Sequence, residues 1–325
     1  MTQPFVTLTE IQAAHARIKP HVRRTFTTRS ASLGAYLGQP VHLKLEHQQI
    51  TGSFKLRGAM NAVLSLDETT RARGIVAVST GNHGRALAHA ARAVGARATI
   101  CMSTLVPQAK IDGIAALGAD IRIIGASQDE AQYEVDRLIA DEGFATIPPF
   151  DNRHVIAGQG TLGLELLDDL PELATVLVQV SGGGLVSGVA AALKARKPDV
   201  RIIGVSMARG AAMHASLAAG KPVEVPELPT LADSLGGGIG LDNHLTFAMT
   251  RALVDDIVLL SEDEIAAGIR HCYEHEGQIV EGAGAVGVAA VLAGKIDSTG
   301  PLGIILSGGN IDMGQHQRLI CGDPV

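Results

Sequence analysis

The amino-acid sequence predicts an α/β protein built on a mostly parallel, doubly wound β-sheet with helices on both faces. The first observation is an alternation along the chain, in which short runs rich in Val, Ile and Leu are separated by longer stretches with helical periodicity. The second is size, because 325 residues that are 46% hydrophobic can bury a large core in one or two domains. Alternating strands and helices form parallel sheets that are buried on both faces.

The individual elements follow from this periodicity. The segments 84–96 and 128–143 are predicted helices, and so is TGSFKLRGAMNA (51–62), which begins an apolar stripe of Leu56, Met60, Val63 and Leu64. The expected strands are residues 41–46, 74–79, 98–102, 121–125, 175–180, 200–205, 256–260 and 303–307.

A domain boundary is expected near residue 150, where two prolines at 148 and 149 precede a polar stretch. Residues 71–147 contain several strand–helix units and are expected to form a small domain inserted into a larger one, made of residues 1–70 and 148–325. Ligands bind such proteins at the carboxyl ends of strands or between domains. The loops that follow the strands are therefore the places to look for chemistry.

Composition excludes several classes of function. The net charge is −6, aromatic residues make up 3% and Trp is absent, so we expect no nucleic-acid partner. Cys101, Cys272 and Cys321 lie far apart, without the spacing of a zinc site or a disulfide framework. No signal peptide and no run of about 20 apolar residues is present. We expect a soluble cytoplasmic protein without a membrane partner.

Four glycine-containing loops stand out. SGGGLVSG (181–188) follows a predicted strand and opens a helix, and its three consecutive glycines suit a phosphate-binding turn. STGNHG (79–84) has the same position after another strand, and is either a capped helix start or an anion site. LSGGN (306–310) and EGAGAVG (281–287) are weaker signals, and Glu281 can be read as a simple acid at a helix N-terminus.

The ligand of the phosphate loop is not predicted to be a nucleotide. The strand after this loop ends in IIGVSM (202–207) without the carboxylate that binds a ribose, and no GxxxxGK[ST] motif occurs. Lys55 begins a helix, where a cation opposes the helix dipole, so it is either a solvated surface lysine or faces an anionic or electrophilic group. A phosphate-bearing aldehyde that condenses with a lysine indicates pyridoxal 5′-phosphate.

At this level of detail the chain resembles the serine/threonine dehydratases and serine racemases, which are pyridoxal-phosphate enzymes of fold type II (tryptophan-synthase-like). The resemblance covers nearly the whole chain through five motifs in order: SFKLRGA, STGNHG, VIAGQGTLGLEL (155–166), SGGGL and LSGGN. It implies a two-domain fold with the cofactor in the interdomain cleft, bound mainly by the large domain, with the small domain supplying the substrate loop. It also implies a homodimer.

The resemblance implies a role for each matching residue. Lys55 is expected to form the imine link to the cofactor and, once released, to remove the substrate Cα proton. Phe54 packs on the pyridine ring, Asn82 hydrogen-bonds its hydroxyl group, and Ser307 faces its nitrogen. The phosphate is bound by backbone amides of Ser181, Gly182, Gly183, Gly184 and Leu185. The substrate carboxylate is bound by Ser79, Thr80, Gly81, Asn82 and His83.

Departures from the family pattern bear on the reaction. Thr80 occupies the position of the serine with which racemases reprotonate Cα, and its stiffer side chain makes racemisation less favoured. Ser206 and Ala212 replace the two acids of the racemases' cation site, so no metal is expected. Arg85 replaces a common glutamine. It is either a surface or ion-paired arginine, or it binds a second substrate carboxylate.

With EGAGAVG, Arg85 resembles the branch of hydroxyectoine-utilisation and β-hydroxyaspartate dehydratases. The expected function is therefore a pyridoxal-phosphate lyase that eliminates water from a β-hydroxy-α-amino acid. The preferred substrate is 3-hydroxyaspartate, giving iminosuccinate or oxaloacetate plus ammonia, followed by L-threonine or L-serine. One alternative is a pyridoxal-phosphate serine or aspartate racemase. Another is a non-catalytic phosphometabolite-binding protein, which would be colourless and would still bind its ligand after Lys55→Ala.

Overall fold

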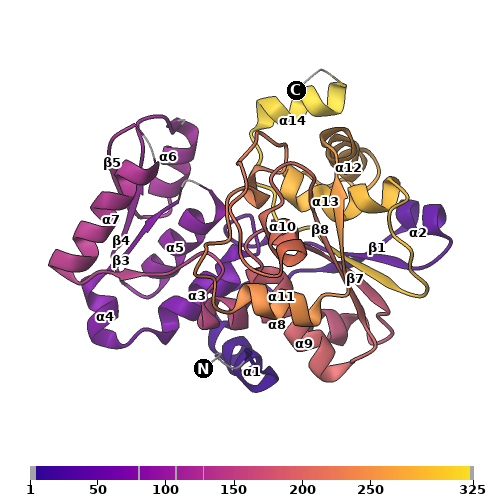
Figure 1. The fold of residues 1–325 in the computed structure, drawn as a ribbon, viewed down its shortest axis with the longest axis horizontal. Helices are drawn as coiled ribbons and strands as arrows, with labels where there is room; N and C mark the ends of the chain where they lie inside the picture. The colour runs from indigo at the N-terminus through magenta and orange to yellow at the C-terminus, as the bar shows by residue number, and fades with distance from the viewer. Residues whose placement is uncertain (1–4, 80, 107, 127, 323–325) are drawn as a thin grey trace.

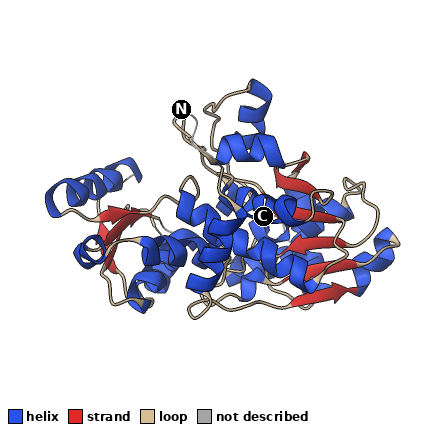
Figure 2. Cartoon of the chain, turned by 90° about the horizontal axis from the view of Figure 1, so that it is seen from below, coloured by secondary structure: helices blue, strands red, loops and turns tan. Residues whose placement is uncertain are grey.

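The structure, a computed structural model, describes residues 5–79, 81–106, 108–126 and 128–322. Two β-sheets lie at opposite ends of the molecule with helices between them (Figures 1 and 2). The expected α/β architecture of mostly parallel sheets covered by helices is confirmed. None of the helices in the described part of the chain combines the length and low polarity that crossing a bilayer requires.

The larger sheet has six strands in the order β1-β2-β10-β7-β8-β9. Only β1 runs antiparallel to its neighbour, and the other pairings are parallel. The strands are β1 (Thr27–Ser30), β2 (Val41–Lys44), β7 (Thr175–Gln179), β8 (Arg201–Met207), β9 (Asp256–Leu260) and β10 (Leu302–Ile305). The carboxyl ends of the five parallel strands therefore share one edge, where ligand loops are expected.

Helices bury both faces of this sheet (Figure 1). Val176 and Val178 pack against one group of helices, whereas Leu177 between them packs against the other. The first group is α8 (Arg153–Asp169), α9 (Gly184–Arg196), α10 (Ala212–Ala219) and α11 (Thr246–Leu253). The second is α2 (Ala31–Leu37), α12 (Glu262–Glu274), α13 (Gly282–Leu292) and α14 (Met313–Cys321). Burial on both faces explains why the strand sequence is nearly all apolar instead of alternating.

The smaller sheet has four parallel strands in the order β5-β4-β3-β6. They are β3 (Ile75–Val78), β4 (Ala98–Met102), β5 (Asp120–Ile123) and β6 (Ala145–Thr146). The nearby helices are α4 (Glu68–Arg73), α5 (Asn82–Ala93), α6 (Gln108–Ala115) and α7 (Gln128–Glu142). All four strands come from one stretch between residues 75 and 146. The domain limits of 1–70 with 148–325, and of 71–147, remain a prediction.

Helix α3 (Lys55–Ser65) joins the two parts, because it packs against both α5 and α8. Leu56, Met60 and Val63 of its predicted apolar stripe are fully buried there. The remaining elements are α1 (Leu8–Ile18) and the short 3₁₀ helices η1 (Glu46–Gln48) and η2 (Asp233–Leu235).

All eight predicted strands are present, with ends that differ by up to two residues. The structure adds β1 and β6, which the sequence analysis missed. Strand β1 has the polar sequence TTRS and pairs at the sheet edge, and β6 has only two residues. Neither contains the apolar run on which the strand predictions depended.

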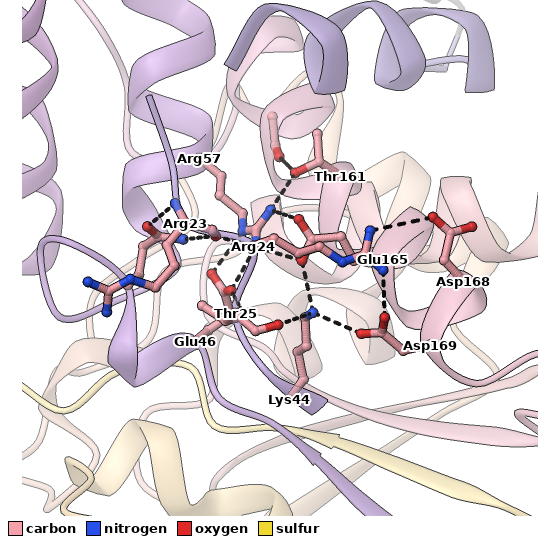
Figure 3. A network of polar contacts seen from close by, with 12 residues as sticks. Arg23, Arg24, Thr25, Lys44, Glu46, Arg57, Thr161, Glu165, Asp168 and Asp169 are labelled. Atoms are coloured by element: carbon pink, nitrogen blue, oxygen red, sulfur yellow. Dashed lines mark hydrogen bonds and ion pairs between the residues drawn. The ribbon is translucent and has the colours of Figure 1, made fainter. Parts of the chain in front are cut away.

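A buried network of charges connects α3 to η1, α8 and strand β2 (Figure 3). The Arg57 side chain has no solvent exposure, and it donates to both carboxylate oxygens of Glu46 at 2.8 and 2.9 Å. It donates equally to both oxygens of Glu165 on α8, at 2.7 and 2.9 Å. Lys44 of β2 lies 2.8 Å from Glu165 and 3.2 Å from Asp169. Charges so far from water are tolerated because each is paired and hydrogen-bonded, and the network fixes the helix turn that begins at Lys55.

Candidate active site

A cleft of about 430 Å³, including its open mouth, lies at the carboxyl ends of β7 and β10. Asn82 of α5 lines it from the small-sheet side, and the other lining residues belong to the part around the large sheet. They are Phe54, Lys55, Phe150, Gln179, Ser181, Gly182, Gly183, Gly184, Leu185, Ser234, Leu235, Glu281, Ala283 and Ser307.

Lys55 enters this cleft from the first residue of α3. The chain just before it is fixed to the loop after β10, because Ser53 bridges Gly308 and the Phe54 backbone N–H donates to Ser307 O at 3.0 Å. Its Nζ donates to the Pro149 carbonyl oxygen at 2.9 Å. Burial lowers the pKa of Lys55 to about 8, although the Glu281 carboxylate partly opposes this shift. The amine is therefore neutral far more often than that of a surface lysine.

Opposite Lys55, the glycine loop begins α9 with free backbone amides. Gly183 is the N-cap residue and has φ +88°, a conformation that favours glycine. A Cβ atom on Gly182 would lie 2.2 Å from the Phe150 ring, and one on Gly184 would lie 2.9 Å from the Phe150 backbone. Side chains at these positions would overlap with Phe150. A helix N-terminus with several unblocked amides is a binding site for a phosphate group.

Asn82, the first residue of α5, is held by two polar side chains. Its Nδ2 donates to Glu281 Oε1 at 2.7 Å, and its Oδ1 accepts from Asn310 Nδ2 at 2.6 Å. Burial, and then the nearby Asp233 charge, raises the pKa of Glu281 to about 7. Although Glu281 is the N-cap of α13, its side chain makes no capping hydrogen bond. Glu281 does stand at the N-terminus of a helix, as the sequence indicates, and its carboxyl group also accepts from Asn82 in the cleft.

The far wall of the cleft carries polar atoms with spare hydrogen-bonding capacity. The buried Ser307 hydroxyl has one long contact, 3.4 Å to the Ala283 carbonyl oxygen. Gln179 donates to Ile305 O at 2.5 Å, and its buried Oε1 has no hydrogen-bond partner among the described residues. Buried polar atoms normally have partners, so this surface is suited to a polar ligand.

These features fit pyridoxal phosphate. Lys55 has a lowered pKa and can react with an aldehyde, the amides at Gly182, Gly183 and Gly184 can hold a phosphate, and Ser307 offers a hydroxyl to a ring nitrogen. Phe54 and Leu185 add apolar surface in the same cleft. The expected cofactor-binding residues are thus brought together by the fold, while their individual roles remain predictions.

Among the residues of the predicted substrate loop that the structure describes, Asn82 lines the cavity and Ser79, Gly81 and His83 do not. Ser79 Oγ accepts from the Gly84 backbone N–H at 2.9 Å, and Gly81 is the N-cap of α5. His83 is buried and contacts the Ile147 carbonyl oxygen at 2.7 Å. Burial, followed by the charge of Lys55, lowers the pKa of His83 to about 3, so the ring is neutral. Thr80 lies outside the described residues.

Arg85 lies one turn further along α5, with its guanidinium against α6. A Cβ atom on Gly113 would come within 2.4 Å of Arg85 Nη1, so glycine makes room for this side chain. No ion pair to Arg85 and no hydrogen-bond partner for its buried Nε occur in the described part of the chain. Burial lowers the pKa of Arg85. The ion-paired interpretation of Arg85 is not supported by this arrangement.

Sequence reasoning missed several residues that the fold brings to the cleft. Phe150, Gln179 and Ser234 line the cleft and belong to none of the quoted motifs. Asn310 contacts Asn82, which lines the cleft, and was given no role of its own. Asn310 was inside the quoted LSGGN segment, so this motif could have identified it. Gln179 could have been noticed as an amide within a strand that is otherwise apolar, since buried polar residues are the informative exceptions.

Comparisons with known proteins agree with this site. A family model described as pyridoxal-phosphate dependent enzyme matches residues 18–308. A Sinorhizobium fredii protein assigned as a threonine dehydratase is 61% identical, over 98% of this chain and 96% of that protein. The L-threonine ammonia-lyase of Thermotoga maritima is 43% identical, over 97% of this chain and 78% of the relative. Among solved structures, maize serine racemase superposes with a TM-score of 0.92 at 36% identity, covering 98% of each chain.

Proposed function

We propose that this protein eliminates water from 3-hydroxyaspartate. The premise is that the chain belongs to the family of pyridoxal-phosphate dependent enzymes and is a lyase of the threonine-dehydratase type. The products are iminosuccinate, and after its hydrolysis oxaloacetate and ammonia. L-Threonine and L-serine are the next substrates, giving a 2-oxo acid and ammonia. The observation that carries the lyase chemistry is that Lys55 and the glycine-rich start of α9 line one cleft.

When bound, pyridoxal phosphate supplies an aldehyde for an amino group and a ring that withdraws electrons from the bonds at Cα. The residues of this chain supply binding and proton transfer. Gly182, Gly183 and Gly184 donate backbone N–H groups to the phosphate, and Phe54 covers the ring. Lys55 Nζ removes the Cα proton, for which its lowered pKa leaves a much larger neutral fraction near physiological pH than a surface lysine has.

The group facing the ring nitrogen favours elimination. Ser307 is a neutral hydroxyl, and a carboxylate at this place would keep the nitrogen protonated. A ring held by Ser307 would be protonated less strongly at its nitrogen, and would withdraw electrons from Cα less completely. This suits departure of a leaving group at Cβ more than transamination.

Arg85 supports the choice of a dicarboxylic substrate. Its guanidinium is partly withdrawn from water and has no carboxylate partner in the described part of the chain. A half-buried cation without an anion is partly desolvated, and a second substrate carboxylate would supply the missing charge. Threonine and serine lack this carboxylate and would leave Arg85 unpaired.

The test is an assay of the purified holoenzyme against a panel of β-hydroxy amino acids, with ammonia and keto-acid release as the signals. We expect turnover of 3-hydroxyaspartate to exceed that of threonine, and Lys55→Ala to abolish both. Arg85→Gln should lower kcat/KM for 3-hydroxyaspartate by at least ~30-fold, since loss of a buried charge pair costs about 2–5 kcal/mol, and should spare threonine. Arg92→Gln, an exposed arginine on the same helix, is the matched control. An equal loss for both substrates in Arg85→Gln would refute the second-carboxylate role.

Racemisation is the second candidate, and the similarity to maize serine racemase favours it. It requires a proton donor on the face of Cα opposite Lys55, and Thr80 is the proposed donor. Chiral chromatography of L-serine incubated with the holoenzyme separates the two activities. Accumulation of D-serine without ammonia would favour the racemase. Ammonia release without D-serine would favour the lyase.

A further inference from the structure

Asn310 lies in the loop after β10 and has an amide orientation that its surroundings determine. Its Nδ2 lies 2.9 Å from the Thr51 backbone carbonyl oxygen, which can only accept a hydrogen bond. The same Nδ2 lies 2.6 Å from Asn82 Oδ1. Both hydrogens of the Asn310 NH₂ group are therefore used, one by the main chain before Lys55 and one by Asn82.

The orientation of the Asn82 amide follows from this arrangement. Its oxygen faces the Asn310 donor, so its NH₂ group faces Glu281, an acceptor at 2.7 Å. A flipped Asn82 would place two NH₂ groups together at Asn310 and an oxygen against the Glu281 carboxyl. The next acceptor, Ser234 Oγ, is 3.5 Å from Nδ2. The second Asn82 hydrogen thus makes only this long hydrogen bond, which a ligand in the cleft that Asn82 lines could replace.

The Asn310 side chain packs against Gly52, in the segment that precedes Lys55. Gly52 has φ +78°, and a Cβ atom there would lie 2.4 Å from Asn310 Oδ1. Glycine at this position both permits the turn and leaves room for the asparagine side chain. The contact ties the Asn310 amide to the segment that precedes the lysine.

We propose that Asn310 is a positioning residue, which acts through Asn82 so that Asn82 presents a hydrogen-bond donor to a ring oxygen of the bound pyridoxal phosphate. Asn310 does this by donating to Asn82 Oδ1, while Glu281 accepts from the other end of the amide. This assignment goes beyond the proposed function, because it depends on the cofactor and not on the identity of the amino-acid substrate.

Two substitutions separate this role from a purely structural one. Asn310→Asp keeps the shape but can only accept, so Asn82 then lies between two carboxylates that both require its single NH₂ group. Asn310→Ala removes the donor and leaves Glu281 to orient Asn82. We expect Asn310→Asp to be more harmful to the cofactor site than Asn310→Ala. A side chain that serves only to fill space would give the opposite order.

The matched control is Asn61→Asp on α3. Asn61 also donates to a backbone carbonyl, that of His154 at 2.7 Å, and its Oδ1 accepts from Arg17 outside the cleft. Asn310 is exposed, so its variants are expected to fold. Circular dichroism and the thermal midpoint of each variant check this directly.

The experiment follows the visible absorption of the bound cofactor in purified holoenzyme without substrate, titrated over pH, together with the dissociation constant of pyridoxal phosphate. We expect Asn310→Asp to shift the midpoint of the spectral titration and to weaken cofactor binding at least tenfold. Asn310→Ala should do both to a smaller extent, and Asn61→Asp should do neither. Equal effects of the two Asn310 variants, or an unchanged titration in Asn310→Asp, would overturn the proposal. Because no substrate is present, failure of the lyase assignment cannot produce either result.

Discussion

The buried charge network under α3 gives the sharpest prediction about the scaffold of the site. Arg57→Met keeps most of the length of the side chain and removes its charge. Glu46 then loses its cation, because the ion pair to Glu46 in the described network comes from Arg57. Glu165 keeps its ion pair with Lys44 at 2.8 Å, so Glu46 is the carboxylate left without a cation.

The expected magnitude follows from this geometry. Removing one partner of a buried ion pair typically costs about 3–5 kcal/mol, because the remaining charge stays out of water without compensation. Both Arg57 and Glu46 have side chains with no solvent exposure, so the upper part of this range applies. Since Arg57 is two residues after Lys55, we also expect Arg57→Met to bind pyridoxal phosphate more weakly.

Equilibrium unfolding in urea, monitored by circular dichroism, measures this cost. Arg97→Met is the control, because Arg97 forms a surface pair with Asp120 at 2.8 Å, where about 0–1 kcal/mol is expected. Adding Glu46→Gln to Arg57→Met should recover part of the loss by removing the stranded charge. A loss in Arg57→Met no larger than that of the control would refute the reasoning about this network.

Three further predictions concern the cleft. Gly182→Ala should lower cofactor affinity at least tenfold, since its Cβ would lie 2.2 Å from the Phe150 ring and either the ring or the loop must move. Unchanged affinity by spectroscopic titration would contradict the phosphate-loop assignment. The rate at which the apoprotein binds pyridoxal phosphate should rise with pH and level off above about pH 8, because only the neutral Lys55 amine reacts. A rate that continues to rise toward pH 10.5 would contradict the lowered pKa of Lys55. Glu281→Gln should move this curve to lower pH, since the Glu281 charge raises the pKa of Lys55; a shift to higher pH would show that the two groups are coupled differently.

Much of the fold could be predicted from the sequence because parallel strands that are buried on both faces are continuous apolar runs. TVLVQV and ATICM are recognisable for this reason, and both are strands. Strand β1 could not be predicted in this way, because Thr27–Ser30 is polar and its pairing with β2 is determined by tertiary contacts.

The site was predictable where one short segment contains the chemistry. Lys55, the glycines before α9 and Ser307 each follow a strand or open a helix, so local sequence already indicates them. Glu281 and Asn310 act on Asn82 across more than 190 residues of chain, and only the folded structure brings them together. Arg57 likewise reads as an ordinary charged residue of an amphipathic helix until its partners Glu46 and Glu165 are known.

The central claim is that Lys55 Nζ carries the cofactor. Reduction of the purified holoenzyme with borohydride, followed by proteolysis and mass spectrometry, would make this bond permanent and locate it. We predict a pyridoxyl-phosphate adduct on the peptide that contains Lys55, and none in Lys55→Ala. An adduct on another lysine, or none in the wild-type protein, would contradict the account.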